Sequence, residues 1–146
     1  MIDTCPAAML SARAMDLLTK GYSPGARIRF VATDVTMLAK ALEARHLSGP
    51  AAGRVLGEAL AAVALLSADT SQADEAICIH MAVDGPVGGL IVEATPAGHL
   101  RGYTNRKILD GPDSLTPIRS DAALGKTGTI HITRTVPGRI LNQESL

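Results

Sequence analysis

The chain has 146 residues and a mass of 15.1 kDa, a normal size for one domain with its own core. Hydrophobic residues make up 47% of it, too many for a disordered chain, and aromatic residues only 2%, so we expect an aliphatic core. Fourteen basic and fourteen acidic residues give a net charge of zero. This balance and the scarcity of aromatic residues argue against a nucleic-acid-binding protein, which is normally basic and stacks bases on aromatic rings.

Two cysteines, Cys5 and Cys78, are too few for a disulfide framework or a four-ligand zinc site. The N-terminus has no basic segment followed by an apolar run, so we expect no signal peptide. The longest charge-free run in the apolar centre, residues 59–68, is too short to cross a bilayer. These observations predict a cytoplasmic protein without a membrane partner.

The first part of the chain predicts little regular structure before one strand. Residues 12–18 predict one or two helical turns, and residues 22–25, Tyr-Ser-Pro-Gly, predict a turn. Charged and apolar residues alternate over 27–31, which predicts a strand with one solvent-exposed face.

An amphipathic helix is predicted next. Thr33 and Asp34 are candidate N-caps, because their side-chain oxygens can accept hydrogen bonds from the N–H groups of a first helical turn. Apolar residues then recur at helical spacing, and we expect the helix to end by Ser48-Gly49. Pro50 suits the first position of a second helix.

The second helix, over about residues 51–68, is strongly apolar. Its only charged residues, Arg54 and Glu58, lie four apart and share one face of the first two turns. After Glu58 the segment is apolar on all sides, so we expect it to be buried between other layers, with β-structure on at least one side. The side chains expected to be nearly inaccessible are Leu60, Val63 and Leu66.

Strands are predicted in the second half of the chain. Residues 77–83 alternate with apolar residues on both faces, which predicts a central strand. Residues 90–92 and 100–104 predict a hairpin, and residues 128–135 predict a last strand after a long loop. The expected fold class is therefore α+β, with mixed or antiparallel sheet layers, a buried apolar helix and a preceding amphipathic helix.

No group of residues in the sequence composes an active site. Gly125-Lys126-Thr127 resembles the end of a phosphate-binding loop, but Ser120 stands where that loop needs a glycine, so a polar turn is the better interpretation. Cys78 is expected to be an inert thiol buried in a strand. The four histidines lack metal-ligand spacing: His46, His80, His99 and His131. We therefore predict no catalytic, cofactor-binding or metal-binding residues.

One stretch is more specific than these motifs. Residues 84–94 read DGPVGGLIVEA, and residues 98–103 read GHLRGY. This signature resembles the centre of the redox-regulated heat-shock chaperone of about thirty-three kilodaltons, the HslO family. The alanine- and leucine-rich segment 53–68 and the LGKTGTI of residues 124–130 are similar to the same family in the same order. The resemblance runs from about residue 27 to residue 141.

The chain departs from the family in three respects. Val83 stands where the family often has glycine, and residues 105–122 match poorly. The family's C-terminal zinc module, with its C-x-C and C-x-x-C cysteine pairs, has no counterpart. We expect an N-terminal extension over 1–25 and a substrate-binding and dimerisation domain over 26–146 that is incomplete at its C-terminal end.

The resemblance implies an ATP-independent holdase without the zinc redox switch. Such a protein is no enzyme; it binds unfolded client proteins on apolar surface, needs no cofactor and forms a homodimer. Two alternatives remain open. One is a structural dimerisation domain without client binding, which an aggregation-protection assay would separate. The other is a small-molecule enzyme, which a deep pocket with perturbed titratable groups would support.

Overall fold

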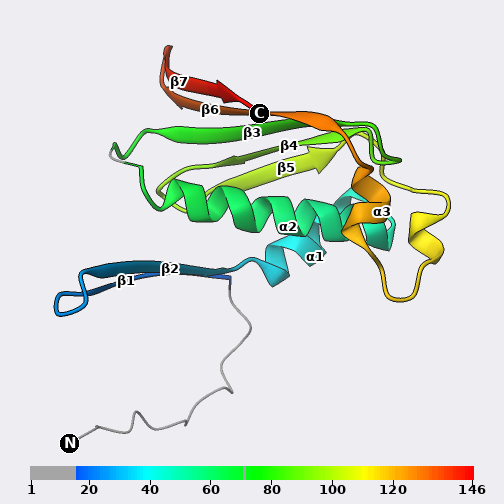
Figure 1. Ribbon diagram of the computed structural model, residues 1–146, viewed down its shortest axis with the longest axis horizontal. Coiled ribbons are helices and arrows are strands. Elements are labelled where there is room, and N and C mark those ends of the chain that lie inside the picture. Colours follow the sequence, from blue (N-terminus) through cyan, green and yellow to red (C-terminus); the bar gives the residue numbers. More distant parts are fainter. Residues whose placement is uncertain (1–15, 71) are drawn as a thin grey trace, which may run out of the picture.

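The computed structural model describes residues 16–70 and 72–146. In chain order the elements are β1 (Leu17–Ser23), β2 (Ile28–Asp34), α1 (Thr36–His46), α2 (Pro50–Ser67), β3 (Ala76–Val83), β4 (Gly89–Ala94), β5 (Leu100–Thr104), the 3-10 helix η1 (Pro112–Ser114), α3 (Ser120–Leu124), β6 (Gly128–Val136) and β7 (Arg139–Ser145). Strands β5-β4-β3-β6-β7 form an antiparallel sheet with the helices on one side of it (Figure 1). The predicted α+β class is confirmed.

β1 and β2 form a separate two-stranded sheet that extends from the helical side (Figure 1). The helical turns predicted over residues 12–18 are wrong at Leu17 and Leu18, which lie in β1; residues 12–15 fall outside the described part. β1 is a strand because it pairs along its whole length with β2, from Leu17 opposite Asp34 to Ser23 opposite Ile28. This hairpin crosses the domain boundary expected after residue 25, and that boundary stays a prediction.

α1 confirms the first predicted helix, but its N-cap differs from the prediction. Val35 occupies the cap position in place of Thr33 or Asp34. Asp34 accepts one N–H of the first turn at 2.9 Å. Asp16, before β1, accepts two more at 2.8 and 2.7 Å. The free N–H groups of α1 are therefore satisfied largely by a carboxylate that is remote in sequence.

α2 begins at Pro50, as the sequence predicts. Gly49 is its N-cap and offers no side chain, so the cap comes from the loop after β5. The carboxylate of Asp113 accepts the N–H of Ala51 at 2.9 Å and the N–H of Leu109 at 2.7 Å. One aspartate thus joins the start of α2 to the long loop that follows β5.

α2 is the central helix of the core and packs against β3, β4 and β5 (Figure 1). Leu60 is 0% exposed and Val63 is also buried, which confirms those two predictions. Leu66 is 42% exposed and Leu65 is exposed too, so burial on every side is wrong. The reason is geometric: α2 lies under the β3-β4-β5 half of the sheet, and its last turns face open space beside β6 and β7.

Within the described part of the chain, α2 is also the one helix long and apolar enough to cross a membrane by length and composition. Nine of its residues are buried against the other elements of the fold. We interpret α2 as a core helix, because packing against a sheet explains the same apolar composition.

Besides β1 and the short η1, two further elements have no counterpart among the predicted ones. α3 is a five-residue helix inside the stretch expected to be a loop. β7 follows β6 through a tight turn and pairs with it, with a register shift between Arg134 and Thr135. β7 carries few apolar residues and a local irregularity, so its sequence lacks the regular alternation typical of a strand.

Candidate protein-binding surface

The most distinctive sequence motif, DGP at residues 84–86, builds a structural link between two loops. The Asp84 carboxylate accepts the N–H groups of Thr127 and Lys126 at 3.1 and 2.9 Å, and the Thr127 hydroxyl at 2.8 Å. These hydrogen bonds, the Thr127 N–H first, hold the pKa of Asp84 below its ordinary value. A Cβ on Gly85 would collide with the backbone of Leu124. The Gly-Lys-Thr segment is thus a polar turn entering β6, as predicted.

The histidines form one pair. His80 on β3 lies opposite His131 on β6, with ring centroids 6.1 Å apart, and the His131 Nδ1 lies 2.7 Å from the Ser145 hydroxyl. His46 and His99 lie apart from this pair, in α1 and in the β4–β5 turn. Across the described residues, no three histidine, cysteine or acidic side chains gather where they could hold a metal ion.

Cys78 is partly exposed rather than buried as expected. Partial burial raises the pKa of its thiol, and the nearby Glu93 carboxylate raises it further. A thiol of this kind is mostly protonated at neutral pH and reacts slowly. Cys5 lies outside the described residues. The single described cysteine does not fit a four-thiolate zinc site, and the absence of bound zinc stays a prediction.

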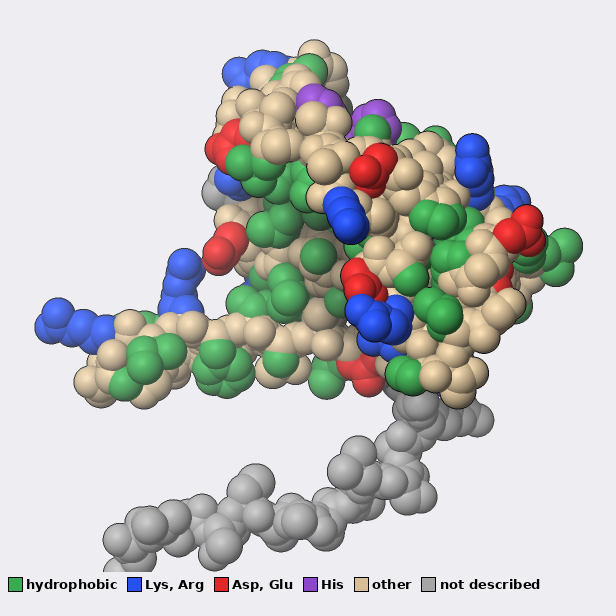
Figure 2. Space-filling model, turned by 45° about the vertical axis from the view of Figure 1, so that its right-hand side comes forward, with side chains coloured by type: hydrophobic (Ala, Val, Ile, Leu, Met, Phe, Trp, Pro, Cys, Tyr) green, Lys and Arg blue, Asp and Glu red, His purple; other side chains and the backbone are tan. Residues whose placement is uncertain are grey.

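Exposed apolar side chains gather in two places, the β1–β2 hairpin and the C-terminal end of α2. Figure 2 shows the hairpin as an arm that leaves the body, with apolar side chains along the arm and on the body above it. On the hairpin, the exposed apolar side chains of one face are Leu17, Ile28 and Phe30. At the end of α2 they are Leu65 and Leu66.

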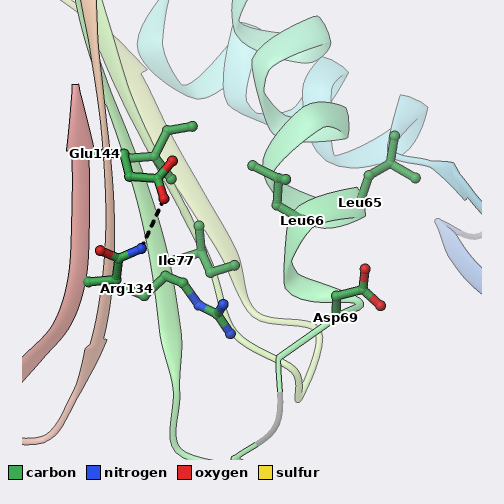
Figure 3. Close-up of a pocket in the computed structure, with 8 residues that line it drawn as sticks. Leu65, Leu66, Asp69, Ile77, Arg134 and Glu144 are labelled. Atoms are coloured by element: carbon green, nitrogen blue, oxygen red, sulfur yellow. Dashed lines mark hydrogen bonds between the residues drawn. The ribbon is translucent and has the colours of Figure 1, made fainter. Parts of the chain in front are cut away.

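The end of α2 borders an open groove of about 270 Å³ against the inner face of the sheet. Leu66 projects from α2 toward the strands and faces Ile77 (Figure 3). Ile132 of β6 continues the apolar lining. Asn142 and Glu144 of β7 add a polar wall, joined by a 3.1 Å hydrogen bond (Figure 3). The groove therefore has an apolar floor and a polar rim, which suits contact with another polypeptide.

Arg134 fixes the mouth of this groove. Its Nε donates to the carboxylate of Glu75 at 2.6 Å, and Glu75 is fully buried. The pair joins the buried Glu75 carboxylate to the partly exposed Arg134 side chain, and so holds the start of β3 against β6. Asp69 lies at the same mouth and forms a weaker ion pair with Arg29 of β2, at 3.6 Å.

The comparisons with known proteins agree on one family. A family model described as Hsp33 protein matches residues 16–144. The 33 kDa chaperonin of Symbiobacterium thermophilum is 33% identical over 120 residues, which are 82% of this chain and 40% of that protein. The 33 kDa chaperonin of Lacticaseibacillus paracasei is 32% identical over 123 residues, 83% of this chain and 42% of that protein.

A solved structure supports the fold. The 33 kDa chaperonin (Heat shock protein 33 homolog) of Thermotoga maritima superposes with a TM-score of 0.76 at 20% identity, over 87% of this chain and 43% of that one. The α+β architecture described above is thus an Hsp33 architecture, and the chain belongs to the Hsp33 family. It spans about two fifths of the length of the curated relatives that it matches.

Sequence reasoning named no binding residues, and it missed both apolar surfaces. For the hairpin a signal was present, since Ile28 and Phe30 alternate with Arg29 and Val31 in the predicted strand. The alternation predicts two faces but not which one the body covers. For Leu66 the apolar helical pattern predicted burial, but the side chain is exposed because its burial depends on where α2 lies under the sheet.

Proposed function

We propose that this chain is a chaperone domain that holds unfolded proteins through exposed apolar surface, without ATP and without covalent chemistry. The observation that carries the proposal is the apolar surface of the hairpin and of the α2 groove on a member of the Hsp33 family. Unfolded proteins expose apolar side chains of every sequence. A non-directional attraction between apolar surfaces would therefore bind many of them.

The titratable groups support binding rather than catalysis. The pKa of Asp84 is lowered by hydrogen bonds from Thr127 on a neighbouring loop, and the pKa of Asp121 is lowered by hydrogen bonds from Arg119, two residues away. Partial burial accounts for the raised pKa of Cys78. A local structural contact therefore explains each of these shifts, and none of them calls for a reacting substrate.

Regulation by zinc release is not part of the proposal. A switch of that kind needs a metal-bound cluster of thiolates that oxidation can release. With Cys78 a slowly reacting thiol, the client-binding surface should be available under reducing and oxidising conditions alike. We place the protein in the cytoplasm, where such thiols stay reduced.

Light scattering of a heat-unfolding client protein tests the proposal. We expect the chain to suppress aggregation to the same extent in reductant, in peroxide, with a chelator and with or without ATP. No suppression in any condition would reject the chaperone function. Suppression that appears only after peroxide would reject the unregulated mechanism and point to Cys5 or Cys78.

A second function, self-association, also has an observation in its favour. The β1–β2 sheet has two strands, and in the described residues neither outer edge is paired with a third strand. Unpaired edges favour pairing with another copy of the same chain. Sedimentation over the micromolar range tests this: a dimer without aggregation protection would identify a structural dimerisation domain, and a monomer throughout would reject self-association.

A further inference from the structure

The β1–β2 hairpin has two different faces. Its inner face turns toward the end of α2, where the Lys20 Nζ donates to the carbonyl of Ala68 at 2.5 Å. Its outer face carries Ile28 and Phe30, which point away from the body because they alternate with the inward Val31. No described element covers this outer face (Figures 1 and 2).

On the outer face of the hairpin, the Phe30 ring packs over a glycine of the neighbouring strand. Phe30 lies directly opposite Gly21, and its ring occupies the space where a side chain on Gly21 would be. This arrangement orders the ring over the glycine, as aromatic residues do opposite glycines in sheets. The other side of the ring stays open, so an incoming side chain could pack against it and against Ile28.

The hairpin is also strongly cationic within a neutral protein. Residues 17–33 contain three basic residues and no acidic one. Arg27 lies in the turn, whereas Lys20 and Arg29 share the inner face with Val31, so their charge acts on a bound segment through the field of the hairpin and not by contact on the outer face. The acidic residues at its base, Asp16 and Asp34, are engaged with the first turn of α1. The ion pair of Arg29 with Asp69 is long and exposed, so it neutralises little of this charge.

We propose that the outer face and free edge of the hairpin bind extended apolar segments with acidic flanks, which add to the hairpin as a third strand. The inference rests on the proposed chaperone function and locates one client-binding site. Backbone hydrogen bonds to a strand edge do not depend on sequence, so this mode suits clients that share none. It also selects unfolded proteins, since a folded protein has few unpaired extended segments to offer. The charge of the hairpin adds the preference for acidic flanks.

The test uses two short fluorescent peptides with the same alternating valine–threonine centre, one flanked by aspartates and the other by lysines. With the full chain, we expect the acidic peptide to bind more tightly, and added salt to narrow the difference because salt screens exposed charges. Equal binding, or preference for the basic peptide, would overturn the charge argument.

Ile28→Ser and Ile140→Ser form a matched pair of variants. Both are exposed strand isoleucines, at 58% and 59%, on β2 and on β7. Ile28→Ser should weaken the binding of the acidic peptide roughly fivefold, because the variant loses the apolar contact of one isoleucine side chain. Ile140→Ser should leave the affinity for the acidic peptide unchanged. Circular dichroism and urea unfolding confirm that both variants fold. Equal effects of the two would overturn the inference.

A third variant, Leu66→Ser, separates the hairpin from the α2 groove. Peptide binding lost in Leu66→Ser but kept in Ile28→Ser would place the segment in the groove and overturn the inference. A change of oligomeric state in Ile28→Ser, with peptide binding intact, would make the outer face a self-association surface and overturn it too. If the unaltered chain binds neither peptide and protects no client, the chaperone function itself fails. If Ile28→Ser loses no protection of clients against aggregation, only the proposed site on the outer face of the hairpin is refuted, and the chaperone function stands.

Discussion

Leu60→Ala tests the central position of α2. Leu60 is 0% exposed and belongs to the aliphatic core that α2 forms with the sheet. Removing a fully buried leucine side chain costs about 2–5 kcal/mol, because the lost contacts leave a cavity that the neighbours only partly fill. In a domain of this size each kcal/mol lowers Tm by roughly 2–4 °C, so we expect a fall of roughly 5 °C or more.

Leu66→Ala on the same helix is the matched control. Leu66 is 42% exposed and borders the open groove, so its removal leaves no enclosed cavity. We expect a loss of about 1 kcal/mol, from the transfer of its remaining apolar area alone. Urea unfolding followed by far-UV circular dichroism measures both variants, with the m-value as the check that the transition is unchanged.

Two results would refute this reasoning. A cost well under 1 kcal/mol for Leu60→Ala would show that α2 is peripheral. Equal costs for Leu60→Ala and Leu66→Ala would show that the groove is closed in solution, for example by self-association.

Four further variants test single contacts of the fold. Asp113→Ala removes the acceptor for the N–H groups of Ala51 in α2 and of Leu109 in the loop after β5, and should cost about 1–2 kcal/mol in urea unfolding. Gly85→Ala has no room for its new methyl group and should cost about 1–3 kcal/mol by the same measurement. The pKa of Asp84 is lower in the folded state than its ordinary 3.8, so its stabilisation is present above that value and is lost as the pH falls through the folded pKa. In Asp84→Asn, acid unfolding should therefore depend less steeply on pH in that range. Cys78→Ser should leave aggregation protection unchanged before and after peroxide, because the thiol it removes has a raised pKa.

Each of these variants has a control or a decisive contrary result. Asp110→Ala, an exposed aspartate near Asp113, should be close to neutral. Gly25→Ala adds a methyl group in open space and should be tolerated, so equal losses at both glycines would contradict the steric argument. An acid-unfolding profile unchanged in Asp84→Asn would show that its hydrogen bonds add no pH-dependent stability. Peroxide sensitivity that disappears in Cys78→Ser would identify a redox sensor.

Local sequence determined the elements that carry their own signals. α2 begins at Pro50 because the fixed φ of proline suits a first helical turn, and the apolar content of α2 commits it to the core. β3 and the β4–β5 hairpin follow from alternating apolar residues between turns rich in glycine and proline. The DGP motif pointed to the Hsp33 family, and its role turned out to be a carboxylate that secures a neighbouring loop.

Tertiary structure decided what depends on residues far apart in the chain. β1 is a strand because β2 pairs with it, whereas its local pattern favoured a helix. Asp16 lies 20 residues before the start of α1, and Asp113 lies 63 residues after the start of α2. Helical spacing cannot reveal that such distant carboxylates accept the N–H groups of these first turns. Leu60 and Leu66 lie on one uniformly apolar helix, and only the sheet above it buries the first and leaves the second exposed. Burial depends on how the helices and the sheet pack together, so the exposure of Leu66 and of the hairpin could not be read from the sequence alone.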